Sequence, residues 1–86
     1  MQIIYTPKAK EHLDYWVNSG NKPILKKIIE LTKAVLKNPY EGIGKPELLK
    51  YELAGYWSRR ITQQHRYVYT IADDTLIIAS LKGHYQ

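Results

Sequence analysis

The spacing of hydrophobic residues changes near the middle of this chain, and that change restricts the fold more than any other feature. Up to residue 38 apolar residues recur every three or four positions, whereas from residue 56 onward they follow a two-residue period. The first spacing is typical of amphipathic helices and the second of half-buried strands. Between them, Pro39–Pro46 holds two prolines and two glycines in eight residues, which excludes regular structure. The sequence therefore predicts an α+β domain.

Local signals place two helices in the first half. Thr6 is suited to the N-cap and Pro7 to the first helical position, so one helix is expected over residues 7–19. A second helix is expected from Lys22 to about Asn38, with its apolar residues on one wide stripe. Because the loop between them is short, the two helices form a hairpin.

The second half predicts three strands, at residues 56–61, 65–71 and 75–81. Their connections are short enough to force hairpins, so these strands form an antiparallel meander. With a short strand at residues 2–5, the element order is β-α-α-β-β-β. We expect a two-helix hairpin packed on a small, mainly antiparallel sheet, in one domain that spans residues 1–86.

Size and composition exclude several classes of protein. An 86-residue chain of 10.1 kDa holds one small core, so any active site lies on the surface of a sheet or helix layer. The absence of cysteine excludes disulfides, thiolate nucleophiles and zinc sites with sulfur ligands, and the three histidines show no metal-ligand spacing. No stretch approaches the roughly 20 apolar residues that span a bilayer. A basic, soluble, cytoplasmic protein without metal or cofactor is expected, with a net charge of +5.

Two arginines are expected to face each other across a hairpin. If the turn is centred on Gln63, Arg60 lies opposite Arg66 on the same face of the sheet. Like charges in facing positions, about 5 Å apart, are destabilising unless something compensates them. A bound phosphate would do so, and acidic side chains are the alternative.

Acid and base candidates lie on either side of the predicted meander. Glu47 is expected in the irregular segment that leads towards the sheet, just after Gly44-Lys45-Pro46. There Lys45 and Lys50 would keep its carboxylate ionised, as a general base or as one half of a surface ion pair. His84, just past the last strand, is suited to proton donation near neutral pH, although it could be an unconstrained tail residue, and Tyr85 offers a ring for stacking. Such a set fits metal-free acid-base chemistry on a phosphodiester, for which RNA supplies its own nucleophile, the 2′-hydroxyl.

Several motifs of the chain occur together in one known family. They are Asn38–Lys50, Leu53–Ile61, His65–Tyr69, the turn Asp73-Asp74-Thr75-Leu76 and the ending His84-Tyr85. Together they closely resemble the YoeB toxins of the RelE/ParE superfamily of toxin-antitoxin systems. The resemblance covers nearly the whole chain from Tyr5 and implies the same compact α+β fold.

The resemblance also implies an activity and partners. The family's activity is that of a ribosome-dependent mRNA endoribonuclease, which cuts codons in the ribosomal A site, inhibits translation and leaves a 2′,3′-cyclic phosphate and a 5′-hydroxyl. The implied partners are the 70S ribosome, mRNA, a neutralising YefM-like antitoxin and a second copy of the chain, in the bacterial cytoplasm. A non-catalytic toxin on the same fold, either a ParE-type gyrase poison or an RNA-binding ribosome blocker, is the alternative.

The resemblance assigns catalytic roles by position. Glu47 looks like the general base, Arg66 like the group that stabilises the charged phosphorane, and His84 like the general acid. Tyr85 looks like a stacking or orienting residue.

The resemblance also bears on phosphate binding and on the tail. The basic residues expected to bind phosphate are Lys45, Lys50, Arg59 and Arg60. The chain departs from the family at Lys82-Gly83, where a basic residue followed by an aromatic is usual, and at the additional Gln86. Gly83 is expected to loosen the tail.

Overall fold

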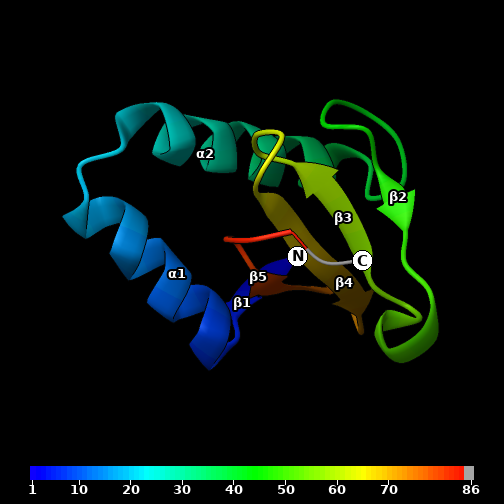
Figure 1. Ribbon diagram of the computed structural model, residues 1–86. Helices are drawn as coiled ribbons and strands as arrows, with labels where there is room; N and C mark the ends of the chain where they lie inside the picture. The colour runs from blue at the N-terminus through cyan, green and yellow to red at the C-terminus, as the bar shows by residue number, and fades with distance from the viewer. Residues whose placement is uncertain (85–86) are drawn as a thin grey trace.

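A computed structural model describes residues 1–84 and shows two helices packed on a five-stranded sheet (Figure 1). The elements, in chain order, are β1 (Gln2–Tyr5), α1 (Pro7–Asn18), α2 (Lys22–Lys37), β2 (Glu47–Leu48), a 3₁₀ turn (Tyr51–Leu53), β3 (Trp57–Arg60), β4 (Arg66–Ala72) and β5 (Thr75–Ser80). The predicted α+β class, the helix hairpin and the mainly antiparallel sheet are thus confirmed.

Both helices begin with the caps that their sequences favour. The Thr6 hydroxyl accepts a hydrogen bond from the Ala9 amide at 3.1 Å, and Pro7 occupies the first turn of α1. At α2, the side chain of Asn21 accepts the Ile24 amide at 3.2 Å. These caps satisfy amides that have no partner within their helix. The apolar stripe of α2 is buried against the sheet, through Ile24, Ile28, Leu31 and Val35.

The sheet has the strand order β1-β5-β4-β3-β2. Strands β3, β4 and β5 form the predicted antiparallel meander, and β1 pairs with β5 in parallel. Asp73 and Asp74 form the β4–β5 turn with φ angles of 49° and 58°, as the tight hairpin turns that match sheet twist require.

One strand departs from the prediction. Glu47 and Leu48 form β2, which pairs antiparallel with β3, so the prediction that Glu47 lies in an irregular segment is wrong. A strand of two residues is too short for an alternating pattern, and its pairing depends on β3 rather than on its own sequence.

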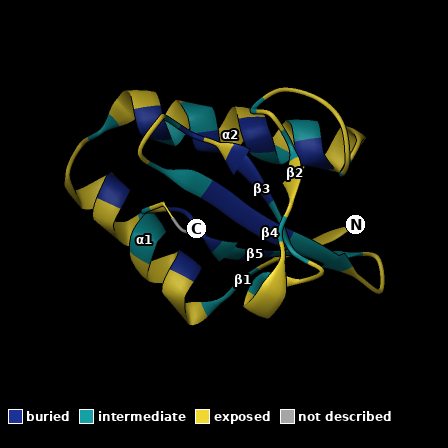
Figure 2. Cartoon of the chain, turned by 45° about the vertical axis from the view of Figure 1, so that its right-hand side comes forward, coloured by how far each residue is buried: buried dark blue, intermediate teal, exposed yellow. Residues whose placement is uncertain are grey.

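The two faces of the sheet have different roles. Tyr67 and Tyr69 of β4 are fully buried beneath the helices, where the Tyr67 hydroxyl shares a 2.7 Å hydrogen bond with Thr32 of α2. Burial raises the pKa of Tyr67 far above its usual range. Figure 2 shows this buried layer along the middle of the sheet and the inner sides of the helices. Residues that alternate with these two tyrosines point to the opposite face.

In residues 1–84, no helix is both long and apolar enough to cross a membrane.

Candidate active site

The register of β2, β3 and β4 gathers polar side chains on the sheet face opposite the helices. Glu47 pairs with Ser58, and Arg60 pairs with Arg66, as the sequence predicts for the two arginines. Ser58 and Arg60 are two residues apart on β3 and therefore share a face. All four side chains thus lie on one side of the sheet.

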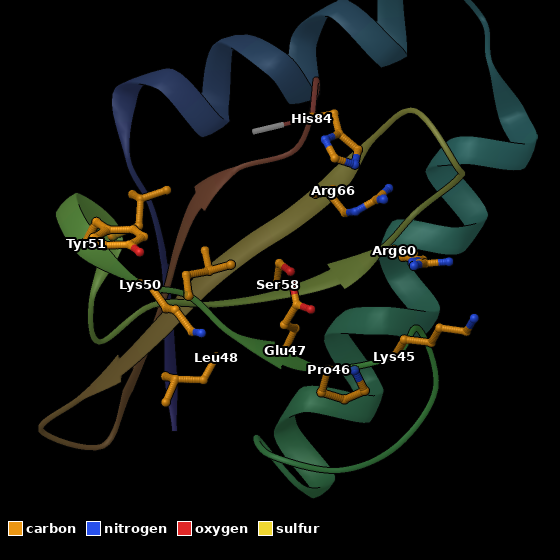
Figure 3. A pocket seen from close by; sticks show the side chains of 12 residues that line it. Lys45, Pro46, Glu47, Leu48, Lys50, Tyr51, Ser58, Arg60, Arg66 and His84 are labelled. Atoms are coloured by element: carbon orange, nitrogen blue, oxygen red, sulfur yellow. The ribbon is translucent and has the colours of Figure 1, made fainter. Parts of the chain in front are cut away.

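A cavity of about 650 Å³ opens over these residues (Figure 3). Its walls come from the segment before β2, from β2 and the turn that follows, from β3 and β4, and from the C-terminal segment. The lining residues are Lys45, Pro46, Glu47, Leu48, Leu49, Lys50, Tyr51, Leu53, Ser58, Arg60, Arg66 and His84. The cavity therefore unites most of the residues that the sequence singled out.

The charge of the cavity is strongly positive. Four cations line it, Lys45, Lys50, Arg60 and Arg66, against the single carboxylate of Glu47. Among the residues that the structure describes, the one ion pair within 4.0 Å joins two residues of α1, so none of these five charges has an ion-pair partner there. Four cations around one opening attract anions, and phosphate oxygens match their chemistry.

The guanidinium of Arg66 is held in place from behind. Its Nη1 donates to the backbone carbonyls of Thr62 at 2.8 Å and Gln63 at 3.0 Å. Within residues 1–84, its Nε and Nη2 make no hydrogen bond. One edge of the group is therefore anchored on the β3–β4 turn, and the other remains able to donate to a ligand in the cavity.

The loop before β2 is fastened to the end of β3. The backbone amide of Arg60 donates to the Gly44 carbonyl at 2.7 Å. Gly44 has a φ of +84°, and an added Cβ would lie 2.8 Å from Leu31 of α2, so only glycine fits there without strain. This close approach places Lys45 beside Arg60 at the cavity wall.

Arg59 is a correction to the predicted site. Its side chain is completely buried on the helix side of β3, where the guanidinium donates to the Tyr69 hydroxyl and to the carbonyls of Asn38, Glu41 and Ile43. Because neighbouring residues of a strand point to opposite faces, Arg59 cannot share the cavity with Arg60. Arg59 is therefore not part of the phosphate-binding set; it holds the loop of residues 38–43 against the sheet.

The C-terminal segment reaches the cavity at His84. His84 lines the cavity and is exposed. Gly83 has a φ of +88°, and its carbonyl accepts the Arg66 amide at 3.0 Å. Glycine adopts this conformation at no steric cost, so Gly83 itself is held beside β4. The predicted stacking residue, Tyr85, and the additional Gln86 lie outside the described residues.

Two of the cavity residues with a hydroxyl group, Tyr51 and Ser58, were not predicted. Tyr51 is 90% exposed and has a φ of +58°, unusual for a bulky residue and typical of strain held at functional sites. Ser58 is buried opposite Glu47. The sequence gives neither residue a role: Tyr51 is one of eight tyrosines, and Ser58 lies within the Leu53–Ile61 motif but reaches the cavity through the pairing of β3 with β2.

Within residues 1–84, no three acidic or histidine side chains gather closely enough to hold a metal ion.

Comparison with known proteins gives a consistent result. The family described as the YoeB-like toxin of bacterial type II toxin-antitoxin systems matches residues 5–85. The chain is 50% identical to a toxin YoeB of Synechocystis sp., over all of this chain and 99% of that one.

Solved structures agree with this. A YoeB/ParE toxin from Agrobacterium tumefaciens superposes with a TM-score of 0.95 at 34% identity, covering 99% of this chain and 100% of the other. A YoeB of Staphylococcus aureus has been solved both as a dimer and in a heterotetrameric complex with YefM. These two structures give TM-scores of 0.89 and 0.88, each at 48% identity over 99% of this chain and 98% of theirs.

Proposed function

The chain belongs to the YoeB-like toxins of bacterial type II toxin-antitoxin systems, and on that basis we propose that it is a ribosome-dependent endoribonuclease that cleaves mRNA in A-site codons. One observation carries the proposal: a single positively charged cavity holds a carboxylate, an imidazole and four cations. A protein that only binds nucleic acid needs the cations, but has no use for a base and an acid placed with them.

The proposed reaction is an in-line transfer within the RNA chain. Glu47 takes the proton of a ribose 2′-hydroxyl, whose oxygen forms a bond to the adjacent phosphorus. The bond from phosphorus to the 5′-oxygen breaks, and His84 gives that oxygen a proton. The products are a 2′,3′-cyclic phosphate and a 5′-hydroxyl. Because the base, the acid and the cations all belong to the chain, the reaction requires no metal or cofactor.

The cations stabilise the charge that develops on phosphorus. Arg66 is anchored through Nη1, so its remaining donors are already oriented before the phosphate enters. Preorganised donors of this kind each contribute about 10²- to 10³-fold in rate. Arg60, on the neighbouring strand, and Lys45 and Lys50, on either side of β2, bind the flanking phosphates.

The aromatic side chains bind bases. Single-stranded RNA is recognised largely by stacking of its bases on aromatic rings. Tyr51 offers an exposed ring at the cavity, and we assign the same role to Tyr85.

The partners follow from the family. The YoeB–YefM complex and the YoeB dimer of Staphylococcus aureus support a YefM-like antitoxin and a second copy of the chain as partners. The 70S ribosome presents the message, which places the protein in the bacterial cytoplasm.

Primer extension on a defined message in a purified translation system tests this function. Wild type is compared with Glu47→Gln and His84→Ala, and with Glu30→Gln, a matched control on the exposed side of α2. We expect cuts inside A-site codons with wild type and Glu30→Gln, and a loss of about 10²-fold or more in the two cavity variants. Stalled ribosomes on intact message, unchanged by either cavity substitution, would instead establish a binding toxin.

A further inference from the structure

The segment that leads to His84 is held by the first helix. The indole Nε1 of Trp16 donates to the Leu81 carbonyl at 2.9 Å, and the Leu81 amide donates to Nδ1 of His12 at 3.1 Å. Leu81 itself is fully buried. The chain therefore leaves β5 along a defined path on α1.

Two adjacent residues, His65 just before β4 and Arg66 at its start, then hold Gly83. Its amide donates to Nδ1 of His65 at 2.9 Å, and its carbonyl accepts the Arg66 amide at 3.0 Å. With the φ of Gly83 at +88°, these two bonds determine where the backbone of His84 begins. The same short segment, His65 and Arg66, therefore contributes a side chain to the cavity and holds the backbone of the tail.

His65 is itself well placed for this contact. Its backbone amide donates to the Thr62 hydroxyl at 3.1 Å, and its carbonyl accepts the Ile61 amide at 3.0 Å. Its ring packs edge to face on Trp16, with the ring centroids 4.8 Å apart. A helix residue and a turn therefore hold the imidazole that binds Gly83.

The bond to Gly83 requires one protonation state of His65. Because the Gly83 amide is the donor, Nδ1 must be unprotonated, and the ring proton is on Nε2. Burial and the nearby Lys82 lower the pKa of His65, which favours this neutral form.

We propose that His65 is a positioning residue: its Nδ1 holds the Gly83 amide and thereby places His84 over the phosphate that Arg66 contacts. This inference rests on the proposed role of His84 as general acid. Displacing a catalytic group by about 1 Å costs on the order of 10²-fold in rate. Loss of the Gly83 bond, one residue before His84, is therefore enough to change the cleavage rate measurably. No part of the RNA needs to touch His65.

Cleavage by His65→Ala and His65→Asn tests the inference. The asparagine Oδ1 lies one bond beyond Cγ, as Nδ1 does in histidine, so it keeps an acceptor for Gly83. At saturating ribosome-bound message, we expect His65→Ala to lower kcat about 10- to 100-fold with little change in KM, and His65→Asn to restore most of it. His12→Ala is the comparison: it removes the Leu81 bond, which lies farther from His84, and we expect it to slow cleavage less than His65→Ala does.

The outcomes separate this inference from the proposed function. If Glu47→Gln and His84→Ala abolish cleavage while His65→Ala cleaves at the wild-type rate, the positioning role is wrong and the nuclease stands. If His65→Asn is as slow as His65→Ala, the acceptor is not what matters and the inference also fails. Should Glu47→Gln and His84→Ala cleave normally, the proposed function fails first.

A measurement that does not depend on activity supplements these assays. Hydrogen exchange of the Gly83 amide reports directly on the bond to His65. We expect protection in the wild type and in His65→Asn, and exchange at least tenfold faster in His65→Ala at unchanged exchange of the β4 core. Equal protection in all three proteins would overturn the inference, even if His65→Ala folds poorly at higher temperature.

Discussion

Replacing Arg59 by methionine removes a buried guanidinium from beneath the loop that leads to Glu47. The substitution keeps an unbranched, apolar stem of similar length on β3. It deletes the donors to the Tyr69 hydroxyl and to the carbonyls of Asn38, Glu41 and Ile43. We expect the 38–43 segment to lose its main attachment to the sheet.

The magnitude follows from these bonds. A buried acceptor left without a partner costs about 1–3 kcal/mol. The carbonyls lie near the surface and regain some water, and the cost of burying the charge disappears, so the net loss is about 3 kcal/mol. For a domain of this size, each kcal/mol lowers Tm by about 4–8 °C, which predicts a fall of about 12–24 °C.

Thermal unfolding of Arg59→Met beside Arg60→Met is the assay. The two arginines are adjacent on β3, one fully buried and one exposed, so Arg60→Met is expected to change stability by no more than about 0.5 kcal/mol. In the cleavage assay, by contrast, we expect Arg60→Met to remain folded but to cleave more slowly than the wild type. A Tm for Arg59→Met within 4 °C of the wild type would refute the structural role given to Arg59.

Three further predictions concern pH, base stacking and the loop. Burial lowers the pKa of both His12 and His65 below 6.5, so in this pH range the unfolded chain binds more protons than the folded chain. Tm should therefore fall as the pH drops from 7.5 to 5.5, and a Tm that does not change with pH would contradict this. Tyr51→Ala should lower kcat/KM for cleavage about 5- to 100-fold, and Tyr51→Phe, which keeps the ring, should leave it unchanged. A kcat/KM for Tyr51→Ala equal to that of the wild type would exclude stacking. Gly44→Ala should destabilise by about 2–4 kcal/mol in denaturant unfolding, because its Cβ would meet α2 at 2.8 Å; Gly20→Ala, also at positive φ but in open space, should cost only about 1 kcal/mol.

Much of the fold could be predicted because its signals are local. The cap at Thr6, the change of hydrophobic period and the short connections each depend on neighbouring residues, and they correctly place both helices and the meander. The pairing of Arg60 with Arg66 follows from the length of one turn. Strand β2 depends instead on its pairing with β3, and its two residues carry no period of their own.

Site residues could be predicted where the residue type and the alternation of strand faces point to the same position. They could not be predicted where the position depends on contacts with distant parts of the chain. Nothing in the pair Arg59-Arg60 indicates which arginine is buried, since burial depends on the loop carbonyls that Arg59 meets. Gly83 looks like a source of flexibility until its amide and carbonyl are seen paired with β4 and the turn before it. Tyr51 becomes conspicuous only through its exposure and its φ angle.

The most direct test of the proposed chemistry removes one oxygen atom from the substrate. A message that carries a single 2′-deoxy nucleotide at the cleaved position of the A-site codon keeps its phosphates and its bases, but lacks the nucleophile from which Glu47 would take a proton. Ribosomes programmed with the all-ribose message should yield a fragment ending in a 2′,3′-cyclic phosphate, and those programmed with the substituted message should yield none at that position. Cleavage of both messages at the same bond would contradict the account, because the attacking oxygen would then come from elsewhere.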